Sequence, residues 1–192
     1  MFVNKKDNIK KQWITVGRMI SAKGIKELLL AWAKQNESFH RVNELLIVGD
    51  GPQLQEFSDL IETMLLNNVI MTGFKTPKEL ETIYSSMDVF IFPTLIDTWG
   101  LVVNEAMAAG LPVVCSRYAG CYSDLVNDKN GIIIDPLDIS DFANKITAFE
   151  KKSIEWSQMG AVSEKMVAEY TIDKSADAIY EAAFESKLCK SM

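Results

Sequence analysis

The sequence predicts an α/β protein built on a doubly wound, parallel, six-stranded sheet. Two observations support this fold class. Short apolar runs rich in β-branched and aromatic residues alternate along the chain with stretches of helical periodicity. Several runs are apolar throughout, as expected for strands that are covered on both faces. Because strands and helices alternate so often, the connections should be right-handed crossovers of the kind that build a parallel sheet.

Six segments have the composition of strands. They are short and apolar, and Gly, Pro or Asp bounds most of them. The predicted strands are residues 13–17, 44–50, 68–73, 88–93, 112–116 and 131–135.

Seven segments between and after the strands predict helices. Thr76 is expected to cap the third of them, with Pro77 at the first helical position, where a missing N–H costs nothing. Pro52 is expected to lie just inside the second helix, and Ser140 to cap the fifth. The predicted helices are residues 24–35, 52–65, 76–87, 99–110, 140–152, about 153–169 and 173–187.

Composition limits the possible functions. Of the 192 residues, 48% are hydrophobic and 24% are charged, which is enough for a packed core. The formal net charge is −6 without a concentrated cluster of Lys and Arg, which disfavours nucleic acid as a partner. His40 is the only histidine, which disfavours a zinc site and a Ser–His or Cys–His catalyst.

Cysteine usage and the start of the sequence indicate a compartment. Cys115, Cys121 and Cys189 show no metal-ligand spacing, and an odd count fits a reduced, cytosolic protein. No apolar run is long enough to span a bilayer, and the polar first residues lack a secretory signal. We therefore expect a cytoplasmic protein without a transmembrane segment.

Ligands of doubly wound sheets bind beyond the carboxyl ends of the strands, so the residues that follow each strand are candidate site residues. Arg18 and Lys23 lie after the first strand, at a helix entrance, where two cations and the helix dipole suit a diphosphate. They also fit an ordinary solvated loop. Gly49, in "GDGP" after the second strand, permits close backbone approach to a ligand, or simply a tight turn.

The third strand is followed by "TGFKT". The backbone at Gly73 and the ring of Phe74 would flank a nucleobase, with the alternative that Phe74 covers the core. The dinucleotide fingerprint GxGxxG is absent from the sequence.

Two acidic residues flank the start of the predicted helix 99–110. Glu105 adjoins the apolar face of this helix, and a carboxylate that accepts two hydrogen bonds suits the vicinal hydroxyls of a ribose. A glutamate near a helix N-terminus is also favourable without any ligand. Asp97 lies in the preceding loop, where an Asx-turn is the alternative to a binding role. The loop "SRYAGCYSD" after the fifth strand could close over this site, and we expect Cys121 within it to be incidental.

Together these segments resemble the C-terminal, donor-binding domain of GT-B glycosyltransferases, specifically the retaining family 4 with its glycosyl transferases group 1 domain. The resemblance runs from Trp13 to Tyr180. The family carries two glutamates separated by seven residues, and Asp97 and Glu105 occupy these positions. The family's usual double glycine after the fifth strand is replaced by Ala119–Gly120. The segments occur in the family's order: "VGRMISAKG", "LLIVGDGPQ", "VIMTGF", "DVFIFPT", "DTWGLVVNEAMAAGLPVV" and "GIIIDPLD".

The resemblance implies a Rossmann-like domain, one half of a GT-B fold, that transfers a sugar from an NDP-sugar to a saccharide or lipid-linked acceptor with retention of configuration. It implies that Glu105 binds the ribose, that Asp97 meets the donor sugar and that Arg18 and Lys23 bind the diphosphate. No metal or cofactor is expected, because these two cations would neutralise the diphosphate. The implied catalytic residues are Asp97, Arg18 and Lys23, and the implied donor-binding residues are Gly17, Arg18, Lys23, Gly49, Gly73, Phe74, Asp97, Gly100, Leu101 and Glu105.

The resemblance also implies a domain organisation. Residues 1–11 would be a remnant of an inter-domain linker, 12–170 the donor-binding domain, and 171–192 a crossover helix and tail. The N-terminal, acceptor-binding domain would be missing, through truncation or because it is a separate chain. We expect the chain alone to bind donor but to transfer sugar poorly or not at all, and to expose an apolar strip along the missing interface. The resemblance suggests polysaccharide biosynthesis, with peripheral contact at the inner face of the cell membrane.

Two alternative functions stay open. Asp97 could mark lost catalysis, which would make the chain a non-catalytic nucleotide-sugar binding or scaffold module. A sugar-nucleotide epimerase shares the two-domain architecture, but such enzymes lack the acidic pair on the helix.

Overall fold

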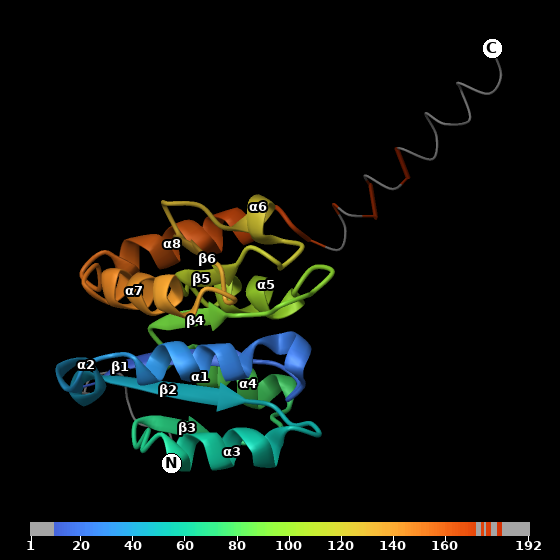
Figure 1. Ribbon diagram of the computed structural model, residues 1–192. Coiled ribbons are helices and arrows are strands. Elements are labelled where there is room, and N and C mark those ends of the chain that lie inside the picture. Colours follow the sequence, from blue (N-terminus) through green and yellow to red (C-terminus); the bar gives the residue numbers. More distant parts are fainter. Residues whose placement is uncertain (1–9, 172–173, 175, 178–179, 182–192) are drawn as a thin grey trace.

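The computed structural model describes residues 10–171 together with 174, 176, 177, 180 and 181. Its centre is a six-stranded sheet in the order β3-β2-β1-β4-β5-β6, with every neighbouring pair parallel (Figure 1). The chain starts in the middle at β1, moves outward to β3, crosses back to β4 and moves outward to β6. This order confirms the predicted doubly wound fold. The strands are β1 (Lys11–Val16), β2 (Asn43–Val48), β3 (Val69–Met71), β4 (Val89–Phe92), β5 (Val113–Ser116) and β6 (Gly131–Ile134).

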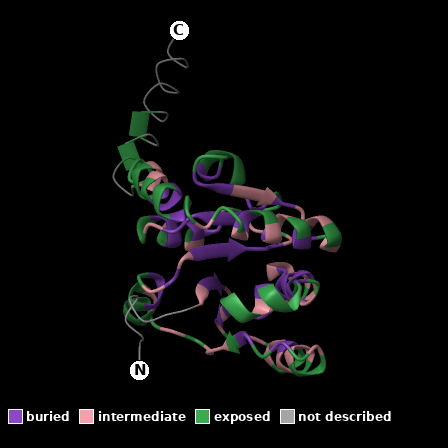
Figure 2. Cartoon of the chain, turned by 90° about the vertical axis from the view of Figure 1, so that its left-hand side faces the viewer, coloured by how far each residue is buried: buried purple, intermediate pink, exposed green. Residues whose placement is uncertain are grey.

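Helices cover both faces of the sheet. One buried cluster joins α1, α3 and α7 to the strands, and a second joins α4, α5 and α6 to the opposite face. Figure 2 shows buried strands between helices whose outer sides are exposed. The helices are η1 (Ser21–Lys23), α1 (Ile25–Ala33), α2 (Glu37–Val42), α3 (Leu54–Thr63), α4 (Pro77–Tyr84), α5 (Leu101–Ala108), α6 (Tyr122–Leu125), α7 (Ile139–Glu150) and α8 (Trp156–Val167).

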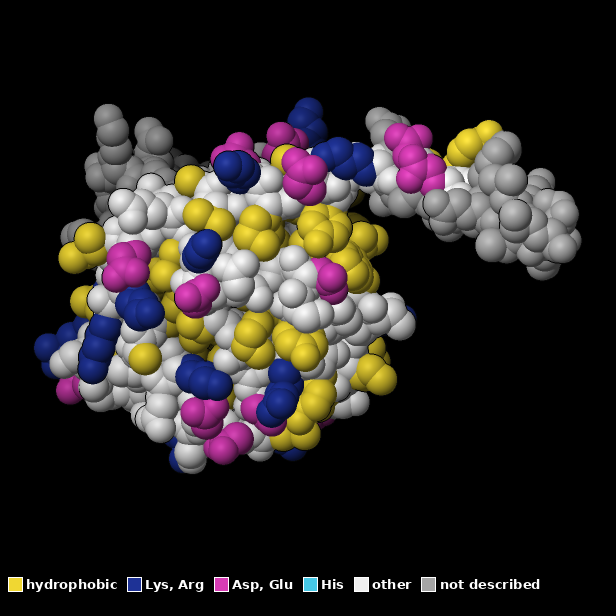
Figure 3. Space-filling model, turned by 90° about the horizontal axis from the view of Figure 1, so that it is seen from above, with side chains coloured by type: hydrophobic (Ala, Val, Ile, Leu, Met, Phe, Trp, Pro, Cys, Tyr) yellow, Lys and Arg dark blue, Asp and Glu magenta, His cyan; other side chains and the backbone are white. Residues whose placement is uncertain are grey.

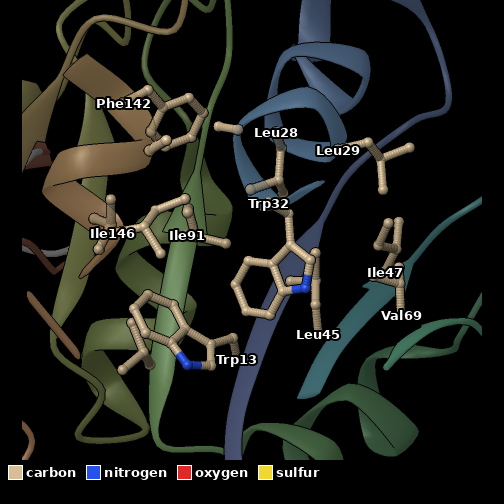
Figure 4. Close-up of a cluster of buried hydrophobic side chains, with 14 of the residues drawn as sticks. Trp13, Leu28, Leu29, Trp32, Leu45, Ile47, Val69, Ile91, Phe142 and Ile146 are labelled. Atoms are coloured by element: carbon tan, nitrogen blue, oxygen red, sulfur yellow. The ribbon is translucent and has the colours of Figure 1, made fainter. Parts of the chain in front are cut away.

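The core under α1 and α7 is built around tryptophans. Trp13 of β1 and Trp32 of α1 are fully buried, and their rings meet edge to face with centroids 5.7 Å apart. Trp156 packs on Trp13 with centroids 5.3 Å apart. The indole N–H of Trp13 donates to Oδ1 of Asn43 at 2.8 Å, so the buried donor keeps a partner. Figure 4 shows Trp13 and Trp32 among aliphatic side chains from both neighbouring strands and helices.

The predicted cap at Thr76 is confirmed, whereas the predicted cap at Ser140 is wrong. Thr76 and Glu79 form a reciprocal capping box at the start of α4, with Pro77 at its first position. At α7 the side chain of Asp138 accepts hydrogen bonds from the backbone N–H groups of Ser140 and the next residue, at 3.1 and 2.9 Å. A carboxylate two residues earlier therefore takes the place that the serine was expected to fill.

Pro52 does not lie inside α3, as predicted, but in the turn before it, because α3 begins at Leu54. The reason is tertiary: the N–H of Gln53 donates to the carbonyl of Met19 at 3.0 Å, which holds this segment against the loop after β1. The predicted helix 99–110 likewise begins later, at Leu101.

Three short elements were not predicted, namely η1, α2 and α6. Each is too short to show a helical repeat in the sequence. The remaining strands and long helices match the predicted segments to within a few residues. Most of the predicted last helix, 173–187, and residues 1–9 of the predicted linker lie outside the described residues.

Candidate functional site

The loops that follow β1 and β4 are fastened to each other. Gly24 has a φ of 66°, and a Cβ at this position would lie 1.9 Å from the carbonyl oxygen of Pro93, so only glycine permits this approach. The carbonyl of Ala22 also accepts the N–H of Leu95 at 2.8 Å. As a result, the η1 turn presents Lys23 to the loop after β4.

Lys23 and Asp97 form an ion pair at this junction. The Lys23 ammonium donates to Oδ2 of Asp97, and the two side chains are 24% and 15% exposed. The other carboxylate oxygen of Asp97 accepts the N–H of Trp99 at 3.2 Å. The Asx-turn that the sequence left open is therefore present, and the same carboxylate also holds Lys23 in place. The ammonium lies 5.9 Å from the ring centroid of Phe92.

The start of α5 lies directly after this carboxylate. Gly100 has a φ of 99°, and a Cβ there would lie 2.6 Å from Cε1 of Phe92. Leu101, the first residue of the helix, is 70% exposed. The first turn of α5 contains no acidic side chain, so nothing within the helix neutralises its positive end. This N-terminus can therefore accept an external anion.

Glu105 lies one turn further along α5 and contacts Tyr84 instead of the Lys23–Asp97 ion pair. Its Oε2 accepts a hydrogen bond from the hydroxyl of Tyr84, at the end of α4, at 3.3 Å. The two residues line a hollow of about 410 Å³ between α4 and α5. The first turn of α5 does not include Glu105, so favourable placement at the helix end does not explain it. The lining residues are Pro77, Leu80, Glu81, Tyr84, Glu105, Ala108 and Ala109.

Tyr84 was missed by the sequence reasoning. Burial raises the pKa of its hydroxyl, and the neighbouring charge of Glu105 raises it further. The available signal was its place on the core-facing side of the predicted helix 76–87, because a buried tyrosine needs a partner for its hydroxyl.

Backbone contacts join the loops after β1, β2 and β3. A Cβ at Gly49, whose φ is 138°, would lie 1.8 Å from the carbonyl oxygen of Gly17. The N–H of Gly49 donates to the carbonyl of Gly73 at 2.9 Å. Phe74 is 71% exposed, so the alternative that it covers the core is wrong. Its ring is available at the surface beside these glycines.

Arg18 is exposed in the loop after β1. Among the described residues no ion pair is found for its guanidinium. Arg18 is thus exposed and available to a ligand, and within the described part of the chain no carboxylate pairs with it.

The loop after β5 packs on the loop that carries Asp97. The N–H of Gly120 donates to the carbonyl of Asp97 at 2.9 Å, and a Cβ at Gly120 would lie 1.9 Å from the carbonyl oxygen of Thr98. Cys121 is buried against Cys115, and this hydrogen-bonded contact together with burial raises the pKa of Cys115. The same contact lowers the pKa of Cys121, but its side chain is fully buried and out of reach of a ligand, which agrees with the expected incidental role.

The structure brings some predicted site residues together and leaves others apart. Lys23 contacts Asp97, and the glycine loops meet at the carboxyl edge of the sheet, toward which the strand arrows point in Figure 1. Glu105 contacts Tyr84, and its hollow is not lined by Lys23, Asp97 or Arg18. That all four charged residues surround one ligand stays a prediction.

Three further observations bear on the class of function. In the face seen in Figure 3, Lys and Arg alternate with Asp and Glu and do not form a continuous basic surface. Within the described residues, no group of three or more His, Cys, Asp or Glu is arranged to hold a metal ion. No helix in this part of the chain has the length and apolar character needed to cross a membrane.

The parallel sheet order and the helices on both faces define a Rossmann-like α/β fold, which is also the fold of one half of GT-B glycosyltransferases. Sucrose-phosphate synthase from Thermosynechococcus elongatus has a similar structure, with a TM-score of 0.77 and 25% identity over 95% of this chain and 46% of that chain. The Anabaena protein HepE, solved in complex with UDP, gives a TM-score of 0.80 at 19% identity over 92% of this chain and 49% of that chain. This second likeness concerns the fold alone.

The chain belongs to the glycosyl transferases group 1 family, whose model matches residues 1–166. It is 30% identical over 172 residues to an uncharacterized glycosyltransferase of Methanocaldococcus jannaschii, covering 89% of this chain and 40% of the relative. It is 34% identical over 136 residues to the sulfoquinovosyl transferase of Arabidopsis thaliana, covering 69% of this chain and 25% of the relative. The chain thus spans less than half the length of these curated relatives.

Proposed function

We propose that the chain is the donor-binding part of a retaining glycosyltransferase that uses a nucleoside-diphosphate sugar. The observation that carries this proposal is the Lys23 ammonium, held by Asp97 beside the start of α5, in a chain of the glycosyl transferases group 1 family. A positioned cation and a helix N-terminus are two features that bind phosphate groups. HepE, which has a similar fold, was solved in complex with UDP, which supports a nucleoside diphosphate as the kind of ligand.

Each part of the donor has a matching group at the edge of the sheet. The diphosphate would lie against Lys23, Arg18 and the N–H groups of Gly100 and Leu101. Gly17 and Gly49 would border the diphosphate through their backbones; a Cβ at Gly49 would lie 1.8 Å from the carbonyl oxygen of Gly17, and a Cβ at Gly17 would lie 3.7 Å from Cγ of Lys23. The exposed ring of Phe74 and the backbone of Gly73 would border the base. The Glu105 carboxylate would accept hydrogen bonds from the ribose hydroxyls.

The chemistry follows from the charge that develops on the leaving group. As the bond between the sugar and the diphosphate breaks, negative charge grows on the diphosphate oxygens. Lys23, Arg18 and the start of α5 would stabilise this charge more in the transition state than in the bound donor, which lowers the barrier. We propose that these groups act without a metal ion, and that Asp97 meets the donor sugar while it orients Lys23.

The acceptor would be bound by a second domain. The chain spans 40% of the Methanocaldococcus relative and 46% of the synthase structure, which leaves room for another domain in the full protein. Exposed apolar side chains at the carboxyl edge, such as Phe74 and Leu101, would face it. We propose that the chain alone binds donor and transfers sugar poorly, and that the full enzyme works on a saccharide or lipid-linked acceptor at the cytoplasmic face of the membrane.

Calorimetric titration of UDP-, GDP- and ADP-glucose into the chain tests the proposal. We expect one of them to bind, and Glu105→Ala to weaken its binding by about tenfold or more, because hydrogen bonds to a charged group are lost. The matched control is Glu164→Ala on α8, which removes an equal charge from an exposed position and should leave affinity unchanged. Absence of binding by all three donors would contradict the proposal. If a donor binds, addition of the N-terminal, acceptor-binding domain should produce sugar transfer. The anomeric coupling constant of the product should then show that the configuration is retained.

A second candidate function is a non-catalytic nucleotide-sugar binding module. The observation that favours it is Asp97, whose two carboxylate oxygens are engaged by Lys23 and by the N–H of Trp99. Under this alternative, donor binding would persist but no transfer would appear after the N-terminal domain is added.

A further inference from the structure

Tyr84 is a buried polar residue that the proposed donor chemistry leaves unused. It is the last residue of α4, is 3% exposed and belongs to the core cluster on that face of the sheet. Its ring meets that of Phe90 edge to face, with centroids 6.1 Å apart. Strand packing therefore fixes the ring, and the hydroxyl has a defined position at the margin of the hollow between α4 and α5.

The hydroxyl of Tyr84, on α4, donates a hydrogen bond to one carboxylate oxygen of Glu105, on α5. The contact joins Tyr84 to Oε2 at 3.3 Å, and Tyr84 is the hydrogen-bond partner that the described residues provide for this carboxylate. A phenol has a single proton to donate. It can therefore hold Oε2 while Oε1 keeps its lone pairs free for other donors.

The hydroxyl of Tyr84 keeps its proton. Burial raises the pKa of Tyr84 far above its ordinary value, and the charge of Glu105 acts in the same direction. The hydroxyl therefore stays protonated and remains a donor at neutral pH. The contact is thus a fixed support for a carboxylate on an otherwise exposed part of the helix surface.

We propose that Tyr84 is a positioning residue, whose hydroxyl holds one carboxylate oxygen of Glu105 so that the other faces the ribose of the nucleotide. This inference rests on the proposed function, because it needs a ribonucleotide beside Glu105. Tyr84 itself does not touch the ligand. It limits the rotation of a long side chain, which lowers the conformational entropy lost when the ribose binds.

The test compares a ribonucleotide with its deoxy form in the 192-residue chain. UDP, GDP and ADP are titrated into wild type, and the one that binds best is measured beside its 2′-deoxy analogue. Tyr84→Phe keeps the buried ring and removes only the hydroxyl. It should weaken binding of the ribonucleotide by about three- to tenfold, the range expected for one hydrogen bond, and affect the deoxy form less. The preference for ribose over deoxyribose should therefore fall.

Two controls separate positioning from a general structural effect. Tyr170→Phe removes a similar bond, from a tyrosine hydroxyl to the backbone carbonyl of Asp124 at 3.4 Å, and should leave the ribose preference unchanged. In the background of Glu105→Gln, Tyr84→Phe should cost little further affinity, because both changes act on one interaction. Thermal unfolding of each variant reports on folding.

The outcomes are distinct. If Tyr84→Phe weakens both nucleotide forms equally, or weakens neither, the positioning role is wrong while the proposed function stands. Additive losses in the double variant would also overturn it. If wild type binds none of the three nucleotides, the proposed function fails first and the inference fails with it.

Discussion

The two ends of the sheet are built from different residues. Near the amino ends of the strands, aromatic rings fill the space, with Trp13 in contact with Trp32, Phe149 and Trp156. At the carboxyl ends, glycines let loops approach one another and charged residues stand above them. The comparison indicates that residues at the amino ends of the strands stabilise the fold, whereas residues at the carboxyl ends serve ligand binding. Substitutions at one end should change the free energy of unfolding, and substitutions at the other should change affinity for the donor.

The largest effect is expected at the amino end. Trp13→Ala leaves a cavity among aromatic rings and removes the indole donor from Oδ1 of Asn43, so the free energy of unfolding should fall by about 3–5 kcal/mol. Urea denaturation followed by fluorescence measures this change. A loss of less than about 1 kcal/mol would show that these rings do not hold the fold together.

Gly24→Ala should break the simple division between the two ends. Gly24 lies at the carboxyl edge of the sheet and has a φ of 66°, and a methyl group at this position would collide with the carbonyl of Pro93. We expect a loss of about 1–3 kcal/mol in unfolding free energy together with weaker donor binding, because Lys23 is displaced. Denaturation and calorimetry on the same preparation report both quantities. Unchanged affinity would mean that the glycine serves the fold alone.

Lys23→Ala should sharpen the division. It removes the cation held by Asp97, so affinity for the nucleoside diphosphate should fall by about tenfold or more. The free energy of unfolding should change by about 1 kcal/mol or less, because the pair is partly solvated. Lys26→Ala, an exposed neighbour on α1, is the matched control and should retain wild-type affinity. Equal losses of affinity in the two variants would indicate a general charge effect.

The smallest effect concerns the cap of α4. Thr76→Ala removes one half of a capping box, and the free energy of unfolding at neutral pH should fall by about 1 kcal/mol. Hydrogen bonds from Thr76 hold the pKa of Glu79 below its ordinary value of 4.5. A lowered carboxyl pKa stabilises the fold above the unfolded value, and this contribution is lost as the pH falls through the lowered value.

The difference between Thr76→Ala and wild type should therefore shrink in acid. Urea denaturation at neutral pH and at about pH 3 provides the comparison, since ordinary carboxyl groups are mostly protonated at the lower pH. A difference that stays constant across this range would show that Glu79 takes no part in the cap.

Much of the fold was predictable because its signals are local. Apolar runs and helical repeats located the six strands and the long helices, and the Thr76–Pro77 pair marked a helix start. The predicted start of α3 was wrong because the N–H of Gln53 donates to a carbonyl that is distant in the sequence. The predicted start of α7 was wrong because Asp138 caps the helix in place of Ser140. The short α2 and α6 carry too few residues for any repeat.

The candidate site was predictable only in part. Asp97, Lys23 and Glu105 follow strands in the sequence, and a parallel sheet brings such positions to one edge. The sequence did not reveal that Asp97 would pair with Lys23, nor that Glu105 would contact Tyr84, because both contacts join different loops or helices. Side-chain partners across elements depend on register and packing, which a single sequence does not specify.

The most direct test of the central claim is a nitrogen-15 NMR titration of the chain with the nucleoside diphosphate that binds best among UDP, GDP and ADP. The account predicts that the amide signals with the largest shifts belong to the loops after β1, β3 and β4, including Lys23, Phe74 and Gly100. Shifts concentrated instead near Trp13 and Asn43 at the amino end, or no shifts at all, would contradict it.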